Sequence, residues 1–342
     1  MALLAMFSFD DEMSLARITD KSVNATIQTG GRTGKMLRLQ GGTANDAADC
    51  YAHILFPSST ATLTTGFAYK PPSGADSSGD GRFVAFRAVA AAIDHVVCYY
   101  DRLTGAVTAK VGATTIGSAT AGTLTLDQWH YVEARILVAD SSGTFDLWVN
   151  GTNVITFTGD TRNGGATAAV DAVRLMGRRL NVSCGFDDLY ILDNSGSVNN
   201  ARLGEIAIEC LRPNGNGNSS QWVGSDGNST DNYLLVDDTT PDTADYVQSG
   251  TSGNKDTYAY GNLAAASGTI AAVQVVSYAS KTAGDALSVQ QVARSGSSET
   301  AATAQAVTAT WAPLTAIFEA KPGGGAWTVS DVNGAEFGVQ VA

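Results

Sequence analysis

The sequence is poor in charged residues. Only 16% of its 342 residues are Asp, Glu, Lys or Arg, against about 25% in a typical soluble protein. Ser, Thr, Asn, Gly and Ala must therefore form much of the surface. Glu is especially scarce, with seven residues against 26 Asp, and Asp favours turns and caps over helix interiors. Together with 37 Gly, this composition predicts strands joined by many turns.

A basic patch and a long apolar run are also missing from the sequence. The net charge is −12, which repels a phosphate backbone unless basic side chains gather locally. The one adjacent basic pair is Arg178-Arg179, so no nucleic-acid partner is predicted. Residues 1–9 are apolar over too short a length for a membrane span, and no basic region precedes them as in a signal peptide. We therefore expect no membrane insertion and synthesis in a host cytoplasm.

The four cysteines contain no closely spaced pair, whereas a structural zinc site usually combines ligands that lie close together in sequence. In a reducing cytoplasm they start as thiols, and free Cys is most often buried. Buried thiols are therefore predicted, and later disulfide formation is left open. The residues are Cys50, Cys98, Cys184 and Cys210.

Alternation of apolar and polar side chains is the main pattern that the sequence does have. In residues 129–138, Val132, Ala134 and Ile136 fall on one side of a predicted strand. Residues 145–149 alternate in the same way, and Asn150-Gly151 then predicts a tight hairpin with a return strand at 154–158. No stretch shows a sustained helical period. The predicted fold class is all-β, with sandwich architecture. Further strand-like runs are 36–39, 82–89, 96–100, 170–176 and 186–192.

The length predicts two domains. Between Asp193 and Gly227 the composition shifts to Asn, Ser and Gly, which is typical of a junction. Residues 205–211 inside this window are apolar and resemble a strand. We therefore place the boundary before them, which gives domains at residues 1–200 and 201–342.

Four sequence phrases in the first half stand in the order seen in laminin-G and concanavalin-like jelly rolls. They are GGRTGKMLRLQG at 30–41, WHYV at 129–132, LWVNG at 147–151 and GFDDLY at 185–190. Residues 1–200 therefore resemble this family. The resemblance implies a jelly roll, and the family's members mostly bind glycans or proteins, while some are architectural.

The second half resembles the C-terminal region of many tailed-bacteriophage structural proteins. The phrases that carry this resemblance are LRPNG at 211–215, SSQW at 219–222, KD at 255–256 and WTVSDVNGAEFGV at 327–339. The resemblance implies a second β-sandwich domain and a virion protein. Its place on the particle, whether neck or collar, tail or capsid decoration, stays open.

Each catalytic motif that we tested lacks a required part. Hydrolases of concanavalin-like folds often carry Glu-x-Asp-x-Glu on one strand, and this sequence does not contain it. The glycine-rich residues 30–35 are one residue too short for a phosphate-binding loop, and Met36 replaces its hydroxyl residue. The histidines His53, His95 and His130 show no metal-ligand spacing. We therefore expect a non-enzymatic protein with no catalytic residues and no organic cofactor.

Asp187 and Asp188 form the most prominent acidic pair. In laminin-G relatives, an Asp at this place closes a turn or contributes to a calcium site, and carboxylate oxygens suit calcium. Asp also commonly caps backbone amides in turns. Calcium is therefore a cofactor hypothesis for Asp187 and Asp188, and a turn carboxylate is the alternative.

Three aromatic residues are candidates for surface contacts. Trp148 falls on the strand face opposite Phe145, and the Tyr99-Tyr100 pair places one ring on each face of its strand. An outward ring can stack on a sugar or pack against a neighbouring subunit.

We favour the subunit contact because interface cores are depleted in charge. The leading hypothesis is a virion structural protein that assembles symmetrically with copies of itself and with other virion proteins. The alternative is a glycan- or receptor-binding fibre module that recognises the host cell surface.

Overall fold

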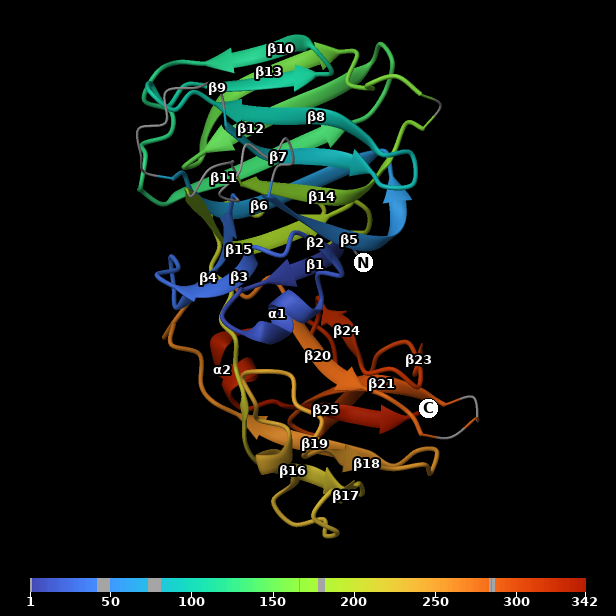
Figure 1. Ribbon diagram of the computed structural model, residues 1–342. Helices are drawn as coiled ribbons and strands as arrows, with labels where there is room; N and C mark the ends of the chain where they lie inside the picture. Colours follow the sequence, from blue (N-terminus) through green and yellow to red (C-terminus); the bar gives the residue numbers. More distant parts are fainter. Residues whose placement is uncertain are drawn as a thin grey trace. The chain divides into compact units, whose positions relative to one another are not determined.

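A computed structural model describes residues 2–41, 50–72, 81–165, 167–177, 182–282, 284 and 287–342 (Figure 1). The chain divides into two compact units. Unit 1 comprises Met1–Asp10 and Ile18–Ile208, and unit 2 comprises Asp11–Arg17 and Glu209–Ala342. The division therefore falls after the predicted boundary at residue 200, and a short N-terminal segment belongs to the second unit. The Arg178-Arg179 pair lies outside the described residues.

Unit 1 is a sandwich of two antiparallel sheets, which we call sheet A and sheet B (Figure 1). Sheet A has the order β13 (Thr152–Gly159), β12 (Gly143–Val149), β11 (His130–Leu137), β6 (Thr62–Lys70), β15 (Ser183–Leu192), β4 (Lys35–Gln40) and β3 (Ala25–Thr29), with β1 (Leu3–Phe7) also paired to β15. Sheet B has the order β10 (Thr114–Ala119), β9 (Val107–Val111), β8 (Ile93–Tyr100), β7 (Gly81–Ala88), β14 (Val170–Gly177), β5 (Cys50–Thr60) and β2 (Asp20–Lys21). The predicted all-β jelly-roll class is confirmed.

Side-chain alternation decides what enters the core between the sheets. Val132, Ala134 and Ile136 of β11 are fully buried, as their spacing predicts. Aromatic rings from both sheets meet there: the ring of Tyr69 on β6 lies 5.0 Å from that of Phe83 on β7, measured between centroids. Burial of such apolar area is the main force that holds the two sheets together.

The predicted hairpin joins β12 to β13. Asn150 and Gly151 have φ angles of 49° and 77°, which are the positive values that a two-residue hairpin turn requires. The Asn150 side-chain oxygen also accepts a hydrogen bond from the Tyr131 amide at 2.9 Å. The turn is therefore tied to the neighbouring strand β11.

Unit 2 contains a sheet with the order β16 (Pro213–Ser220), β19 (Lys255–Tyr260), β25 (Glu336–Val341), β21 (Ser288–Ser295) and β22 (Ser298–Ala301), with β23 (Gln305–Ala306) also on β21. Two further pairs are β17 (Val223–Gly224) with β18 (Val247–Gln248) and β20 (Val273–Ala279) with β24 (Ala312–Phe318). Trp327 and Phe337 anchor a core that includes Phe318 of β24, so this unit is a second β-sandwich. Its short helices are α1 (Glu12–Ala16), η1 (Asn232–Leu235) and α2 (Val329–Asn333). Across the described ranges, no helix reaches the length and apolar character that a membrane span needs.

The junction differs from the sequence-based prediction. The apolar residues 205–211 form no strand, whereas the Gly-Asn stretch after them is β16. This strand lies at the sheet edge, where Glu336 accepts hydrogen bonds from the Asn218 amide at 2.7 Å and the Thr257 hydroxyl at 3.0 Å. Polar side chains therefore hold β16 in place, and the apolar alternation that marks other strands is missing from it.

Candidate functional site

Four residues form a row across the outer face of sheet A. The strand register places Trp148 opposite Glu133, Glu133 opposite Gly66, and Gly66 opposite Tyr190. A Cβ atom at Gly66 would approach the Tyr190 ring to 2.2 Å, so only glycine lets that ring lie against β6. The Tyr190 hydroxyl donates a hydrogen bond to Glu133 Oε1 at 2.6 Å. We call these four residues row A.

Residues 193–208, which we call the strap, cover row A. The Arg202 guanidinium forms an ion pair with Glu133 and lies 4.9 Å from the Trp148 ring centroid. The Gly204 amide also donates to Glu133, at 2.8 Å. These donors satisfy a carboxylate that is only 1% exposed. Trp148 lies on the outer face as predicted, but a residue of its own chain packs against the ring.

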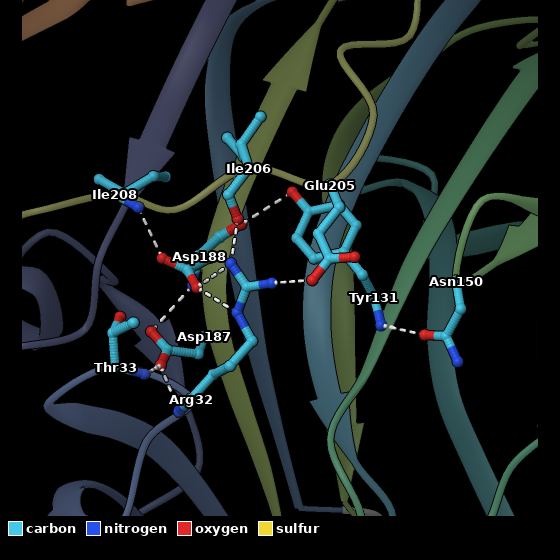
Figure 2. A network of polar contacts seen from close by, with 9 residues as sticks. All are labelled: Arg32, Thr33, Tyr131, Asn150, Asp187, Asp188, Glu205, Ile206 and Ile208. Carbon is cyan, nitrogen blue, oxygen red and sulfur yellow. Dashed lines mark hydrogen bonds and ion pairs between the residues drawn. The ribbon is translucent and has the colours of Figure 1, made fainter. Parts of the chain in front are cut away.

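A second polar network fixes the end of the strap, as Figure 2 shows. Arg32, in the turn between β3 and β4, donates from Nε and Nη2 to Asp188 Oδ2 at 2.8 and 2.7 Å. Its Nη1 donates to Glu205 at 2.6 Å, and Nη2 also donates to the Ile206 carbonyl. The Ile208 amide completes the network by donating to Asp188 Oδ1 at 2.6 Å. Arg32 therefore joins strand β15 to the strap.

Asp187, next to this network, receives hydrogen bonds from three backbone amides. Its Oδ2 accepts from Arg32 N at 2.8 Å and Thr33 N at 3.2 Å, and its Oδ1 accepts from Asp188 N at 2.9 Å. Burial, followed by the charge of Asp188, raises the pKa of Asp187 to about 8, while the amides act in the opposite direction. The glycine-rich turn thus presents amides to a carboxylate of its own chain.

At the predicted calcium site, the oxygens of Asp187 and Asp188 accept hydrogen bonds from the protein itself. Every carboxylate oxygen of Asp187 and Asp188 faces an N–H donor. Within the part of the chain that the structure describes, no group of three or more Asp, Glu, His or Cys residues is arranged to hold a metal ion. This geometry lends calcium binding no support, and the calcium hypothesis stays a prediction.

A different row crosses the outer face of sheet B. It runs over β9, β8, β7, β14, β5 and β2. Residues next to its members along the strands, such as Cys98 and Val84, are fully buried in the core, so the row itself lies on the opposite, outer face. The row begins with a lysine, continues with two apolar residues, and ends with an arginine, a histidine and an aspartate. We call it row B, and its members in strand order are Lys110, Val97, Ala85, Arg174, His53 and Asp20.

Asp20, at the end of row B, holds two side chains of β5. Its Oδ2 lies 2.6 Å from His53 Nδ1, and its Oδ1 accepts a hydrogen bond from the Tyr51 hydroxyl at 3.1 Å. Burial lowers the pKa of His53, and the hydrogen bond to Asp20 acts in the opposite direction. His53 is 5% exposed, and among the described residues its Nε2 has no hydrogen-bond partner.

Two arginines continue this network. Arg174 Nη1 and Arg87 Nη1 donate to the two carboxylate oxygens of Asp94 at 3.0 and 2.7 Å. The Arg174 guanidinium also lies 4.9 Å from the Tyr51 ring centroid. The Nε atoms of both arginines are buried without an acceptor in the described structure, although most buried polar groups have a partner.

Tyr99 and Tyr100 face opposite sides of β8, as predicted. Tyr100 is a core residue with 1% of its surface exposed, and its ring centroid lies 6.1 Å from that of Tyr69. Consecutive strand residues alternate in direction, so only Tyr99 reaches the outer face and stays a candidate for surface contacts. Lys110 Nζ and Arg82 Cζ lie 4.7 and 5.6 Å from its ring centroid.

A small apolar cluster separates Tyr99 from Tyr51. Ala85, Val97 and Met176 form it, and the two partly exposed tyrosines pack against it. Sequence reasoning missed Tyr51, His53 and Arg174 as site residues. The available signal was the alternation of Tyr51 and His53 on one strand, but their pairing with Arg174 depends on the fold.

No protein-family model and no curated protein matches the sequence. Solved structures do match it. An alginate lyase is 14% identical with a TM-score of 0.32, over 46% of this chain and 80% of its own. Carbohydrate-binding module CBM66 from Bacillus subtilis is 15% identical with a TM-score of 0.32, over 50% and 92%. A carbohydrate esterase from Shiga toxin-encoding bacteriophage phi24B is 12% identical with a TM-score of 0.38, over 55% and 99%.

These matches correct one prediction. The comparisons contradict the expectation of a non-enzymatic protein: an alginate lyase and a carbohydrate esterase are among the structures of similar fold. Missing one-strand motifs do not exclude an enzyme, since acid and base groups can come from separate strands. The similar structures include a carbohydrate-binding module and a phage protein, whereas no family match supports the resemblance to virion structural proteins.

Proposed function

We propose that unit 1 binds carbohydrate on the outer face of sheet B. The observation that carries this proposal is the pair Tyr51 and Tyr99, two partly exposed rings on either side of an apolar cluster. A sugar ring offers flat apolar area that stacks on an aromatic ring. Arg174 and Asp94 beside these rings supply hydrogen-bonding groups for the sugar hydroxyls.

The outer face of sheet A is less suited to this task. Tyr190 is fully buried on this face, and Arg202 of the strap packs over the Trp148 ring. A ligand on this face would have to displace the strap, which is held by an ion pair and by hydrogen bonds. On sheet B, the cations beside the two tyrosine rings belong to the strands of the sheet itself. Sheet B is therefore the face on which we place the sugar.

A glycan array probed with the full chain tests this proposal. We expect retention of specific glycans by the wild type and about fivefold weaker binding by Tyr99→Ala, because an aromatic stacking contact contributes about 1 kcal/mol. Trp148→Phe, on the strap-covered face, is the matched control and should bind as the wild type does. Retention of no glycan, or equal binding by Tyr99→Ala, would contradict the proposal.

We also propose that the protein is part of a tailed-phage particle, made in the host cytoplasm and displayed on the particle exterior. The sequence resemblance of the second half supports this proposal. The low share of charged residues fits surfaces that pack against copies of the chain and other virion proteins. Mass analysis of purified particles should find this polypeptide, and particles that lack it would refute a virion role.

A further inference from the structure

We infer that the carbohydrate bound on sheet B carries carboxylate groups, and that Arg174 and Arg87 form the subsite that receives one of them. The inference rests on the proposed carbohydrate binding and names the class of ligand.

Unpartnered nitrogens are the first reason. Nε of Arg174 and Nε of Arg87 are buried N–H donors, and the described residues offer neither of them an acceptor. Arg174 lies directly opposite His53 across β14 and β5, and both Arg174 and Arg87 reach Asp94. Two N–H donors on neighbouring strands that lack an acceptor among the described residues match a ligand group that is rich in acceptor oxygens.

Charge is the second reason. Arg174 and Arg87 share the carboxylate of Asp94. The carboxylate of Asp20 near Arg87 is already engaged by the His53 ring and the Tyr51 hydroxyl. Asp94 accepts from Nη1 of each guanidinium, whereas the edge that carries Nε is also suited to bidentate pairing with a carboxylate. Each arginine side chain stays 16% exposed, so a ligand reaches part of each guanidinium from solvent, and pairing with the buried Nε requires the side chain to shift.

The third reason is the position of the tyrosines. The Arg174 guanidinium lies 4.9 Å from the Tyr51 ring centroid, so a sugar stacked beside Tyr51 holds a ring carboxylate close to Arg174. Tyr99 has basic neighbours in the same way, Lys110 and Arg82. Each exposed ring of this face thus has a cation beside it, as a chain of acidic sugars requires.

The test compares two forms of the same polymer. Polygalacturonate and alginate are titrated into the full chain by calorimetry, and each is compared with material whose carboxylates have been reduced to hydroxymethyl groups. We expect at least tenfold weaker binding of the reduced polymers, and binding of the acidic polymers that weakens as salt is raised.

Variants assign the effect to the subsite. Arg174→Gln should weaken binding of the acidic polymer about tenfold. The affinity of Arg174→Lys should fall between that of Arg174→Gln and that of the wild type, because lysine keeps the positive charge but cannot form a bidentate pair with a carboxylate. Arg135→Gln removes an exposed arginine from sheet A and should bind normally. If Arg174→Gln does not fold, as thermal melting reports, Arg87→Gln supplies the same measurement.

The outcomes separate this inference from the function on which it rests. Equal binding of acidic and reduced polymers, or equally tight binding of a sulfated polysaccharide, overturns the carboxylate assignment and leaves carbohydrate binding standing. Wild-type affinity in both Arg174→Gln and Arg87→Gln overturns the subsite. Failure of every glycan to bind overturns the proposed function itself.

Discussion

The two outer faces of unit 1 use similar side chains for opposite purposes. On sheet A, Arg202 and Arg32 come from the strap and a turn, and they satisfy carboxylates that the sheet buries. On sheet B, Arg174 and Arg87 share one aspartate, and their Nε atoms have no acceptor among the residues that the structure describes. The contrast lies in the partners: sheet A receives them from the strap and a turn, whereas on sheet B the described residues leave donors unpartnered, and there we propose that a ligand binds.

The largest effect is expected where the strap is joined to sheet A. Arg32→Ala leaves the fully buried Asp188 without its guanidinium, and removal of one partner of a buried ion pair costs about 3–5 kcal/mol. Urea denaturation measures the loss of unfolding free energy. Arg135→Ala, an exposed arginine of the same sheet, should change it by less than about 0.5 kcal/mol. Similar losses in both variants would show that the strap contacts do not stabilise sheet A.

A smaller loss should follow from filling the space beneath Tyr190. Gly66→Ala places a methyl group against the Tyr190 ring, and such overpacking typically costs about 1–3 kcal/mol. The shift of the ring also weakens the hydrogen bond that the Tyr190 hydroxyl donates to Glu133. The double variant Gly66→Ala/Tyr190→Leu should recover part of the thermal stability, since it removes the clash. No recovery would mean that the strain lies elsewhere.

Removing Arg202 should open the covered face with a moderate loss of stability. Glu133 keeps its hydrogen bonds from Tyr190 and Gly204, and Arg202 is 33% exposed, so Arg202→Ala should cost only about 1–2 kcal/mol. Trp148 then loses the cation over its ring. Acrylamide quenching of tryptophan fluorescence should rise, and Trp148→Phe in the same background should abolish the rise. Unchanged quenching would contradict a strap that shields Trp148.

The smallest effect concerns the pH dependence of row B. Burial lowers the pKa of His53 below its ordinary value of 6.5, so the unfolded chain takes up a proton before the folded protein does. Through this group, unfolding free energy is at its full value above pH 6.5 and falls as pH decreases below it, by less than about 1.4 kcal/mol per pH unit. His53→Gln should flatten the profile measured between pH 7 and 5. An unchanged profile would indicate that His53 titrates normally.

Much of unit 1 could be predicted because its strands bury one face and alternate. Residues 129–138 and the Asn150-Gly151 hairpin are seen where the pattern put them. Strand β16 could not be predicted in this way, because an edge strand held by Glu336 needs no apolar side chains. The N-terminal residues 11–17 gave no sign that they belong to unit 2, since that depends on partners distant in sequence.

The candidate site was only partly accessible from sequence. Alternation predicts that one of Tyr99 and Tyr100 faces outward, but only the packing of both sheets decides which one does. Asp187 and Asp188 were found as an acidic pair, whereas their partner Arg32 lies far away in sequence. Likewise, Arg174 meets His53 only through the register of β14 and β5. Long-range pairing of this kind leaves no local pattern.

The division of the N-terminal residues has a consequence for the order in which the chain folds during synthesis. Strand β1 pairs with β15, so the first residues of unit 1 wait until residue 192 has been made. Directly after β1, the α1 segment is held in unit 2, where Asp11 pairs with Arg212 and Arg17 donates to Gln274 at 3.1 Å. Contacts so distant in sequence slow folding. No single proteolytic cut can therefore release either unit whole, and a fragment that begins at residue 209 would lack the α1 segment of unit 2.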